Sequence, residues 1–242
     1  MKRNIGGRER LKTAVYFADT DCLRDAELFE SARDIVSPTR RERTDRMRFA
    51  ASKRLSLGAG LLLMRAMSDE GLDPFQSDTA DGKHGKPYLT AYPEMRFSLA
   101  HSGSVAMCVT ADVNTGCDIE RIADARPEVA ERFFDEAETR DISGTEDPLR
   151  AARFYWYWTL KESYVKCLGT GMSTELGSFR IRETDSGIRV ADGDGTLPFS
   201  FLIPACPDGY AAACCFECAS PPETAETECV DLFKFIAKFP AE

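Results

Sequence analysis

The feature that most constrains the fold is an aromatic run that ends in a cluster of charges, FYWYWTLKESYVKCLGTG, at Phe154–Gly171. No proline or glycine interrupts residues 150–168, so the segment predicts one helix of about five turns. One face carries Phe154, Trp158, Glu162 and Val165 or Lys166 at three- and four-residue spacing. So many aromatic side chains are typical of a helix buried in a core. The charged end, with Lys161, Glu162 and Lys166, then lies where that core meets solvent. It is either an ordinary surface ion pair or part of a functional site.

The order of the other predicted elements indicates the fold class. Strands are predicted at 13–18, 96–99, 105–110, 117–121, 179–182, 188–190, 199–203 and 210–216, and helices at 25–34, 38–47, 51–67, 127–134 and 135–141. Strands and helices thus come in alternating groups, which predicts an α+β fold with helices packed on antiparallel sheets. Residues 1–111 and 112–220 each hold helices followed by strands, so we expect two similar halves. Residues 221–242 are expected to form a C-terminal tail. The polar segment 220–227, at its beginning, is expected to be a linker.

Composition excludes several classes of protein. The chain has 242 residues, of which 43% are hydrophobic, enough for one large domain or two small ones. It lacks an apolar run long enough to span a membrane, and its N-terminus lacks the apolar core of a signal peptide. We therefore expect a cytoplasmic protein without a membrane partner. The net charge of −9 argues against a nucleic-acid partner.

Nine cysteines allow two interpretations. Several lie inside apolar strand-like runs, which is typical of reduced, packed thiols in a reducing compartment. The other interpretation is a zinc site built from the C-x-x-C pair Cys215 and Cys218 with Cys206 and Cys229. A strand would separate these ligands wrongly, so we favour packed thiols.

Two carboxylates in one predicted strand form a second candidate feature. In Asp118-Ile119-Glu120 the two acids point to the same face, because side chains alternate along a strand. Adjacent carboxylates repel unless a cation lies between them, and a hard divalent cation prefers oxygen ligands. Solvated alternating charge would give the same pattern. His101 and Lys86 are candidate phosphate contacts, or alternatively a structural hydrogen-bonding histidine and a solvated loop lysine.

Four segments, in this order and spacing, resemble a known family. They are GKPYL at 85–89, FSLAHSG at 97–103, GCDIERI at 116–122 and FYWYWTLKESYVKCLGTGM at 154–172. Together they resemble the Sfp-type 4′-phosphopantetheinyl transferases, over about residues 37–183. The resemblance implies two similar α/β halves with coenzyme A bound in the cleft between them. It implies transfer of phosphopantetheine from coenzyme A to a serine of an apo acyl- or peptidyl-carrier protein, with Mg²⁺ and with release of 3′,5′-ADP.

The resemblance also implies roles for individual residues. The metal ligands would be Asp118, Glu120 and Glu162, and the catalytic residues would be Glu162, Lys161 and His101, with Glu162 or a bound water as the base. Coenzyme A would be held by Lys86, His101, Ser102, Lys161 and Lys166 at its phosphates, by Arg40 and Arg43 near its 3′-phosphate, and by Ser56. Each of these cations offsets part of the charge of a polyanion. We expect a monomer that serves fatty-acid, polyketide or nonribosomal-peptide synthesis.

Two other functions use the same residues. Another metal-dependent phosphate enzyme, such as a nucleotidyl transferase, needs the same acids and cations but neither coenzyme A nor a protein serine. A catalytically dead binding module would keep the fold and lose part of the acid and lysine set. Asp118, Lys161 and Glu162 are all present, which favours an active enzyme.

Overall fold

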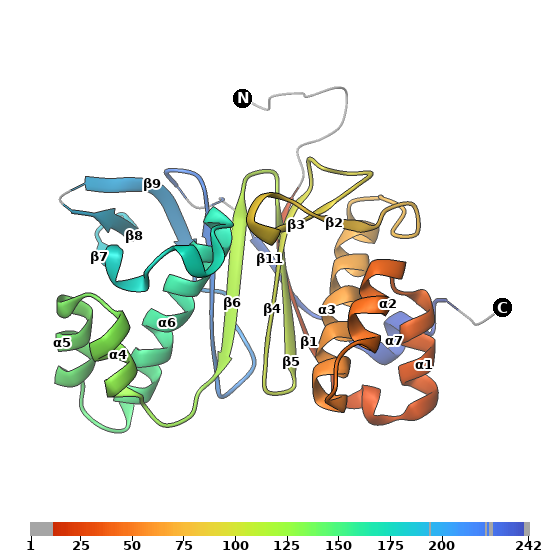
Figure 1. Ribbon diagram of the computed structural model, residues 1–242, viewed down its shortest axis with the longest axis horizontal. Coiled ribbons are helices and arrows are strands. Elements are labelled where there is room, and N and C mark those ends of the chain that lie inside the picture. Colours follow the sequence, from red (N-terminus) through yellow and green to blue (C-terminus); the bar gives the residue numbers. More distant parts are fainter. Residues whose placement is uncertain (1–11, 194, 221, 223–224, 240–242) are drawn as a thin grey trace. The chain divides into compact units, whose positions relative to one another are not determined.

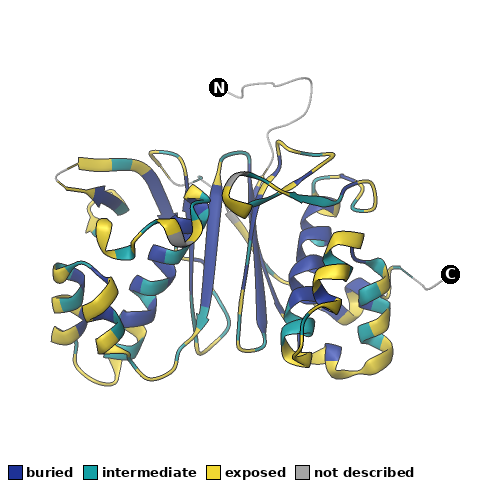
Figure 2. Cartoon of the chain, viewed as in Figure 1, coloured by how far each residue is buried: buried dark blue, intermediate teal, exposed yellow. Residues whose placement is uncertain are grey.

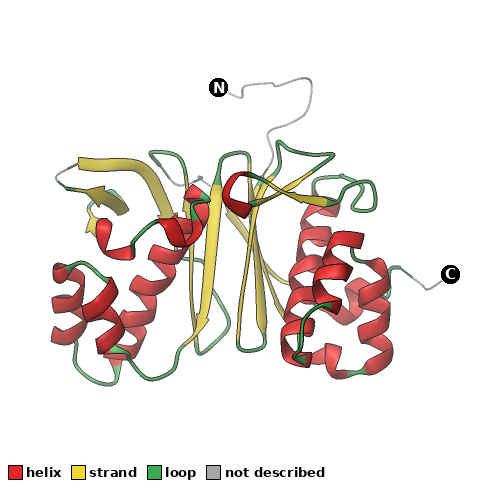
Figure 3. Cartoon of the chain, viewed as in Figure 1, coloured by secondary structure: helices red, strands yellow, loops and turns green. Residues whose placement is uncertain are grey.

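The computed structural model describes residues 12–193, 195–220, 222 and 225–239, with the side chains of Lys83, Met172 and Ala225 left undescribed. The chain forms two compact units (Figure 1). Unit 1 comprises residues 1–82, 87–112 and 222–242, and unit 2 comprises residues 83–86 and 113–221. Each unit combines a sheet with packed helices (Figure 3), so the predicted α+β class is confirmed.

Unit 1 is a four-stranded sheet covered by helices. Its sheet has the order β11 (Ala225–Cys229), β1 (Thr13–Asp19), β5 (Val105–Ala111) and β4 (Arg96–Ser102). The helices are α1 (Ala26–Ile35), α2 (Pro38–Asp45), α3 (Ala50–Asp69) and α7 (Leu232–Ile236), with a 3-10 turn η1 (Asp21–Arg24) and a small hairpin β2 (Thr79–Asp81) and β3 (Pro87–Leu89). Strand β5 is buried along its whole length (Figure 2), and α3 packs on the face that carries Ala106 and Cys108.

Local sequence signals account for several boundaries in unit 1. Asp25 and Ser37 accept hydrogen bonds from Leu28 N and Arg40 N and so cap the first turns of α1 and α2. Pro38 occupies the first turn of α2, where its missing N–H costs nothing. The twenty residues of α3 carry the apolar block that fills the core of unit 1.

Unit 2 is a five-stranded antiparallel sheet with the aromatic helix against it. The strand order is β6 (Thr115–Arg121), β10 (Tyr210–Phe216), β9 (Gly195–Leu202), β8 (Gly187–Asp192) and β7 (Arg180–Thr184). Its helices are α4 (Pro127–Phe133), α5 (Glu136–Gly144) and α6 (Leu149–Leu168), with 3-10 turns η2 (Lys83–Gly85), η3 (Gly171–Ser173) and η4 (Leu176–Ser178). The aromatic helix α6 packs on β6 and β10 (Figure 1). It ends at Gly169, whose φ of 70° is the left-handed conformation that glycine adopts readily.

Two segments depart from the expected division into residues 1–111, 112–220 and 221–242. The C-terminal segment is part of unit 1, because β11 pairs in parallel with β1 and α7 joins the core of unit 1. The expected linker at 220–227 therefore ends inside a strand, and the expectation of purely antiparallel sheets is wrong for this pair. Residues 83–86 belong to unit 2, although the strands that flank them belong to unit 1.

All nine cysteines are free, and Cys108, Cys117, Cys167, Cys214 and Cys215 are buried. The interpretation as packed thiols is confirmed for these five cysteines, whereas Cys22 and Cys229 are exposed and Cys206 and Cys218 are partly buried. Among the residues that the structure describes, no helix has the length and hydropathy that a membrane crossing requires.

Candidate active site

The acid pair is positioned by a direct contact between the backbones of β6 and α6. A Cβ atom built on Gly116 would lie 2.1 Å from the carbonyl oxygen of Ser163 and 2.3 Å from the backbone nitrogen of Cys167. Only a residue without a side chain allows this approach. Residues 116, 118 and 120 share one face of the strand, so Asp118 and Glu120 face α6, where Glu162 and Lys166 lie.

Asp118 is the most strongly perturbed group of this cluster. Its side chain is buried, and Oδ1 accepts a hydrogen bond from Lys166 Nζ at 2.6 Å. Its Oδ2 is buried and has no hydrogen-bond partner among the described residues. Burial raises the pKa of Asp118 to about 7, with Lys166 opposing the shift and Glu120 and Glu162 adding to it. Oδ2 of Asp118 is therefore a buried acceptor that lacks a donor among the described residues. The nearby carboxylates of Glu120 and Glu162 add negative charge around Asp118.

The two other acids lie within electrostatic reach of Asp118. Glu162 is half-buried, and burial raises the pKa of its carboxyl group, opposed by Lys166 and reinforced by Glu120. Burial lowers the pKa of Lys166, but the charge and hydrogen bond of Asp118, together with the other acidic groups nearby, raise that pKa overall. Lys166 is thus a protonated cation held against Asp118.

These carboxylates suit a hard divalent cation by their chemistry. Mg²⁺ binds to carboxylate and water oxygens, and Oδ2 of Asp118 is a buried carboxylate oxygen with no partner among the described residues. In the part of the chain that the structure describes, no three acidic, histidine or cysteine side chains are gathered closely enough to hold a metal as they stand. Lys166 instead occupies Oδ1 of Asp118, so a cation would have to share this carboxylate with the ammonium group.

Lys161 does not lie with the acids. Its side chain is fully buried, and its ammonium group pairs with Glu138 of α5 at 2.8 Å. It also donates to the carbonyl oxygens of Leu176 and Phe179 at 2.7 and 2.9 Å. The expected phosphate contact at Lys161 is therefore at odds with this geometry, because the core of unit 2 encloses the group. Glu138 was not singled out from the sequence, although its place three residues after the α5 N-cap Asp135 fits a capping box.

Lys86 also makes structural contacts. Its ammonium group donates to the carbonyl oxygens of Thr115 and Cys167 at 2.8 and 2.9 Å. Cys167 is in the last turn of α6, where carbonyl groups lack helical partners and where a positive charge is favourable. The aliphatic part of the Lys86 side chain packs on Gly169, because a Cβ atom at Gly169 would lie 3.0 Å from Cδ of Lys86. Lys86 thus caps α6 and ties the GKP segment to β6.

The remaining predicted residues belong to unit 1 and are described within it. Arg43 and His101 are exposed and Ser102 is half-exposed, with the last two at the end of β4. Ser56 is buried, and its hydroxyl group shares a 2.8 Å hydrogen bond with that of Thr44, which joins α3 to α2. The Ser56 hydroxyl therefore already has a partner inside the protein.

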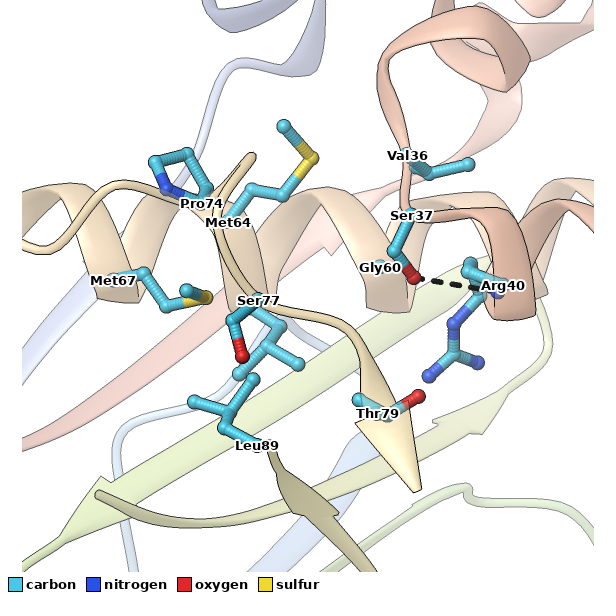
Figure 4. A pocket seen from close by; sticks show the side chains of 11 residues that line it. Val36, Ser37, Arg40, Gly60, Met64, Met67, Pro74, Ser77, Thr79 and Leu89 are labelled. Atoms are coloured by element: carbon cyan, nitrogen blue, oxygen red, sulfur yellow. Dashed lines mark hydrogen bonds between the residues drawn. The ribbon is translucent and has the colours of Figure 1, made fainter. Parts of the chain in front are cut away.

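Arg40 lies at a mostly apolar recess of unit 1 (Figure 4). The recess is lined in part by Met64, Met67 and Leu89, with Ser37 and Thr79 near the guanidinium group. Burial, followed by the charge of Arg43, lowers the pKa of Arg40 to about 10. The guanidinium group is nevertheless cationic at neutral pH, as an anion contact requires.

Comparisons with known proteins agree on one family. The family model of the 4′-phosphopantetheinyl transferase superfamily matches residues 114–215, which include β6 and α6. A 4′-phosphopantetheinyl transferase of Bacillus subtilis is 31% identical over 182 residues, covering 74% of this chain and 81% of that protein. The 4′-phosphopantetheinyl transferase Sfp of Bacillus subtilis strain 168 is 28% identical over 186 residues with the same coverage. The 4′-phosphopantetheinyl transferase psf-1 of Bacillus pumilus is 30% identical over 159 residues, covering 65% of this chain and 68% of that protein. The chain therefore belongs to the 4′-phosphopantetheinyl transferase superfamily.

Proposed function

We propose that this chain transfers the 4′-phosphopantetheine group of coenzyme A to a serine of an apo acyl- or peptidyl-carrier protein, with Mg²⁺ and with release of 3′,5′-ADP. The observation that carries the proposal is the buried carboxylate of Asp118, whose Oδ2 has no partner among the described residues. It faces Glu162 and Lys166 in a chain of this superfamily. A buried carboxylate oxygen without a donor is costly, and a cation bound at Oδ2 would offset that cost.

Asp118, Glu120 and Glu162 would hold the Mg²⁺, which would neutralise pyrophosphate charge when bound. The serine oxygen forms a bond to the β-phosphorus of coenzyme A, and the bond from that phosphorus to the oxygen of 3′,5′-ADP breaks. The carboxylate of Glu162, whose pKa is raised by burial, accepts the serine proton directly or through a water molecule.

Lys166 is the cation that we assign to the pyrophosphate, since its ammonium group already lies at the acids. Arg40, Arg43, His101 and Ser102 are proposed as further contacts to coenzyme A. Lys161 and Lys86 are omitted from direct contact, because backbone carbonyls and, for Lys161, Glu138 take up their ammonium groups. The free cysteines suit a cytoplasmic place of action, and we expect the active species to be a monomer.

The experiment is to follow 3′,5′-ADP by chromatography while the protein is incubated with coenzyme A and an apo carrier protein. We expect release with Mg²⁺, none after EDTA, and recovery when Mg²⁺ is restored. Glu162→Ala should abolish release, and Glu136→Ala is its matched control, because Glu136 is 94% exposed on α5 and its removal should leave the rate unchanged. Release that continues at full rate in EDTA would refute the metal assignment, and hydrolysis of coenzyme A without a carrier would favour a different phosphate enzyme.

A further inference from the structure

A fully buried ion pair lies in the core of unit 2, outside the acid cluster. The side chains of Lys161 and Glu138 are 0% and 1% exposed, and Nζ lies 2.8 Å from Oε2. The rings of Phe134 and Phe179 lie 5.4 and 4.3 Å from the same ammonium group. Charged side chains are almost never buried so completely unless they are paired, so this pair calls for an explanation.

The ammonium group of Lys161 has no donor to spare for a substrate. A lysine has three N–H donors, and here Glu138, Leu176 and Phe179 supply three acceptors within 2.9 Å. The two carbonyl groups belong to the connection between α6 and β7. Lys161 therefore joins three elements: α6, α5 and the segment that leads into β7.

Glu138 is held equally firmly on its side. Its Oε1 accepts from Ile181 N at 2.7 Å, and its Oε2 accepts from Asp135 N at 3.1 Å. Asp135 in turn forms a two-bond ion pair with Arg180, at 2.7 and 2.9 Å. The network thus connects the start of α5 to the start of β7, and Lys161 connects both to α6.

The position of Lys161 in the helix links this network to the acids. Successive residues of a helix are rotated by about 100°, so holding Lys161 in the core fixes the direction in which Glu162 leaves α6. Lys166, five residues further, follows the same rotation. Buried ion pairs are weak sources of stability, because desolvation offsets much of their attraction. Fixing the rotation of α6 accounts for the pair better than stability does.

We propose that Lys161 is a positioning residue, whose buried pair with Glu138 holds the rotation of α6 that presents Glu162 and Lys166 to Asp118, and that Lys161 does not contact the phosphates of the substrate. The consequence for turnover depends on the proposed function. The consequence for stability does not.

The test is a double-variant cycle of Lys161→Met, Glu138→Gln and the combination of both, with Arg140→Met as the control. Arg140 is on α5 and is 77% exposed. Lys161→Met leaves a buried carboxylate without its counter-charge, whereas the combined variant is neutral and nearly conserves volume. We expect Lys161→Met to lower Tm and to lower kcat by about tenfold or more, because small misplacements of catalytic groups are costly. The KM for coenzyme A should change by less than about threefold, since no substrate contact is lost.

The combined variant distinguishes positioning from phosphate contact. We expect it to regain most of the lost Tm, since replacing both members of a buried pair is often close to neutral. Its kcat should stay well below that of the wild-type protein, because the pair that holds the rotation of α6 is absent, and its KM for coenzyme A should stay within about threefold. A KM for coenzyme A raised about tenfold or more in both variants that lack Lys161 would overturn the proposal, as would a combined variant that turns over at the wild-type rate. If the wild-type protein shows no transfer, the proposed function fails, and the Tm values still test the pair.

Discussion

Replacing Gly116 by alanine tests the backbone contact on which the acid cluster depends. The new Cβ would lie 2.1 Å from Ser163 O and 2.3 Å from Cys167 N, and both obstacles are backbone atoms. Neither can rotate away, so β6 and α6 must separate by about 0.9 Å to reach 3.0 Å, a spacing that is still tight. Asp118 and Glu120 would move away from Glu162 by a similar distance.

The expected cost has two parts. Overpacking of a close-packed contact costs about 1–3 kcal/mol of unfolding free energy, which lowers Tm by roughly 2–4 °C per kcal/mol for a chain of this size. A displacement near 1 Å between catalytic groups can cost about 10²-fold in turnover. Differential scanning calorimetry measures the first effect, and the rate of 3′,5′-ADP release measures the second.

Gly144→Ala is the matched control, because a Cβ at Gly144 would meet no atom within 4 Å. Its rate should equal that of the wild-type protein, and its Tm should be equal or slightly higher, because alanine restricts the unfolded chain more than glycine does. If Gly116→Ala retains the wild-type Tm and turns over within about twofold of the wild-type rate, the backbone contact at Gly116 does not position the acids. Separating β6 from α6 by about 0.9 Å cannot leave both stability and turnover unchanged.

Two further predictions concern single side chains. Burial raises the pKa of Asp118 from its ordinary 3.8 to about 7, so between these values the folded state holds a proton that the unfolded state releases. In metal-free protein, urea titrations should therefore show the unfolding free energy falling as pH rises through this window, by up to about 1.4 kcal/mol per pH unit. Asp118→Asn should flatten the slope, and an unchanged slope would contradict the assignment. Lys86→Met should remove the two hydrogen bonds to Thr115 and Cys167 and cost about 1–3 kcal/mol in urea unfolding; unchanged stability would show that Lys86 does not cap α6.

The sequence predicts the elements whose signals are local. The uninterrupted aromatic run predicts a helix at 150–168, and the structure has α6 at Leu149–Leu168. Ser37 and Pro38 mark the start of α2 by side-chain chemistry that acts within one turn. The alternation at 118–120 likewise predicts that Asp118 and Glu120 share a face, since the period of two is a property of any strand.

The missed features depend on partners far away in the chain. Strand β11 has a polar sequence, and its pairing with β1 joins residues more than two hundred positions apart, so composition alone indicates a linker. A lysine beside Glu162 suggests a solvent-facing cation, and only its partner Glu138 on another helix turns Lys161 inward. Gly116 is visible in the sequence, but its purpose needs the position of α6.

The proposed transfer of phosphopantetheine is tested most directly by the intact mass of an apo carrier protein after incubation with this enzyme, coenzyme A and Mg²⁺. We expect a gain of one phosphopantetheine group on the carrier serine, and no gain with Glu162→Ala. A wild-type protein that leaves the mass of several apo carriers unchanged would contradict the proposed function. A Glu162→Ala variant that modifies the carrier at the wild-type rate would contradict the assignment of the base.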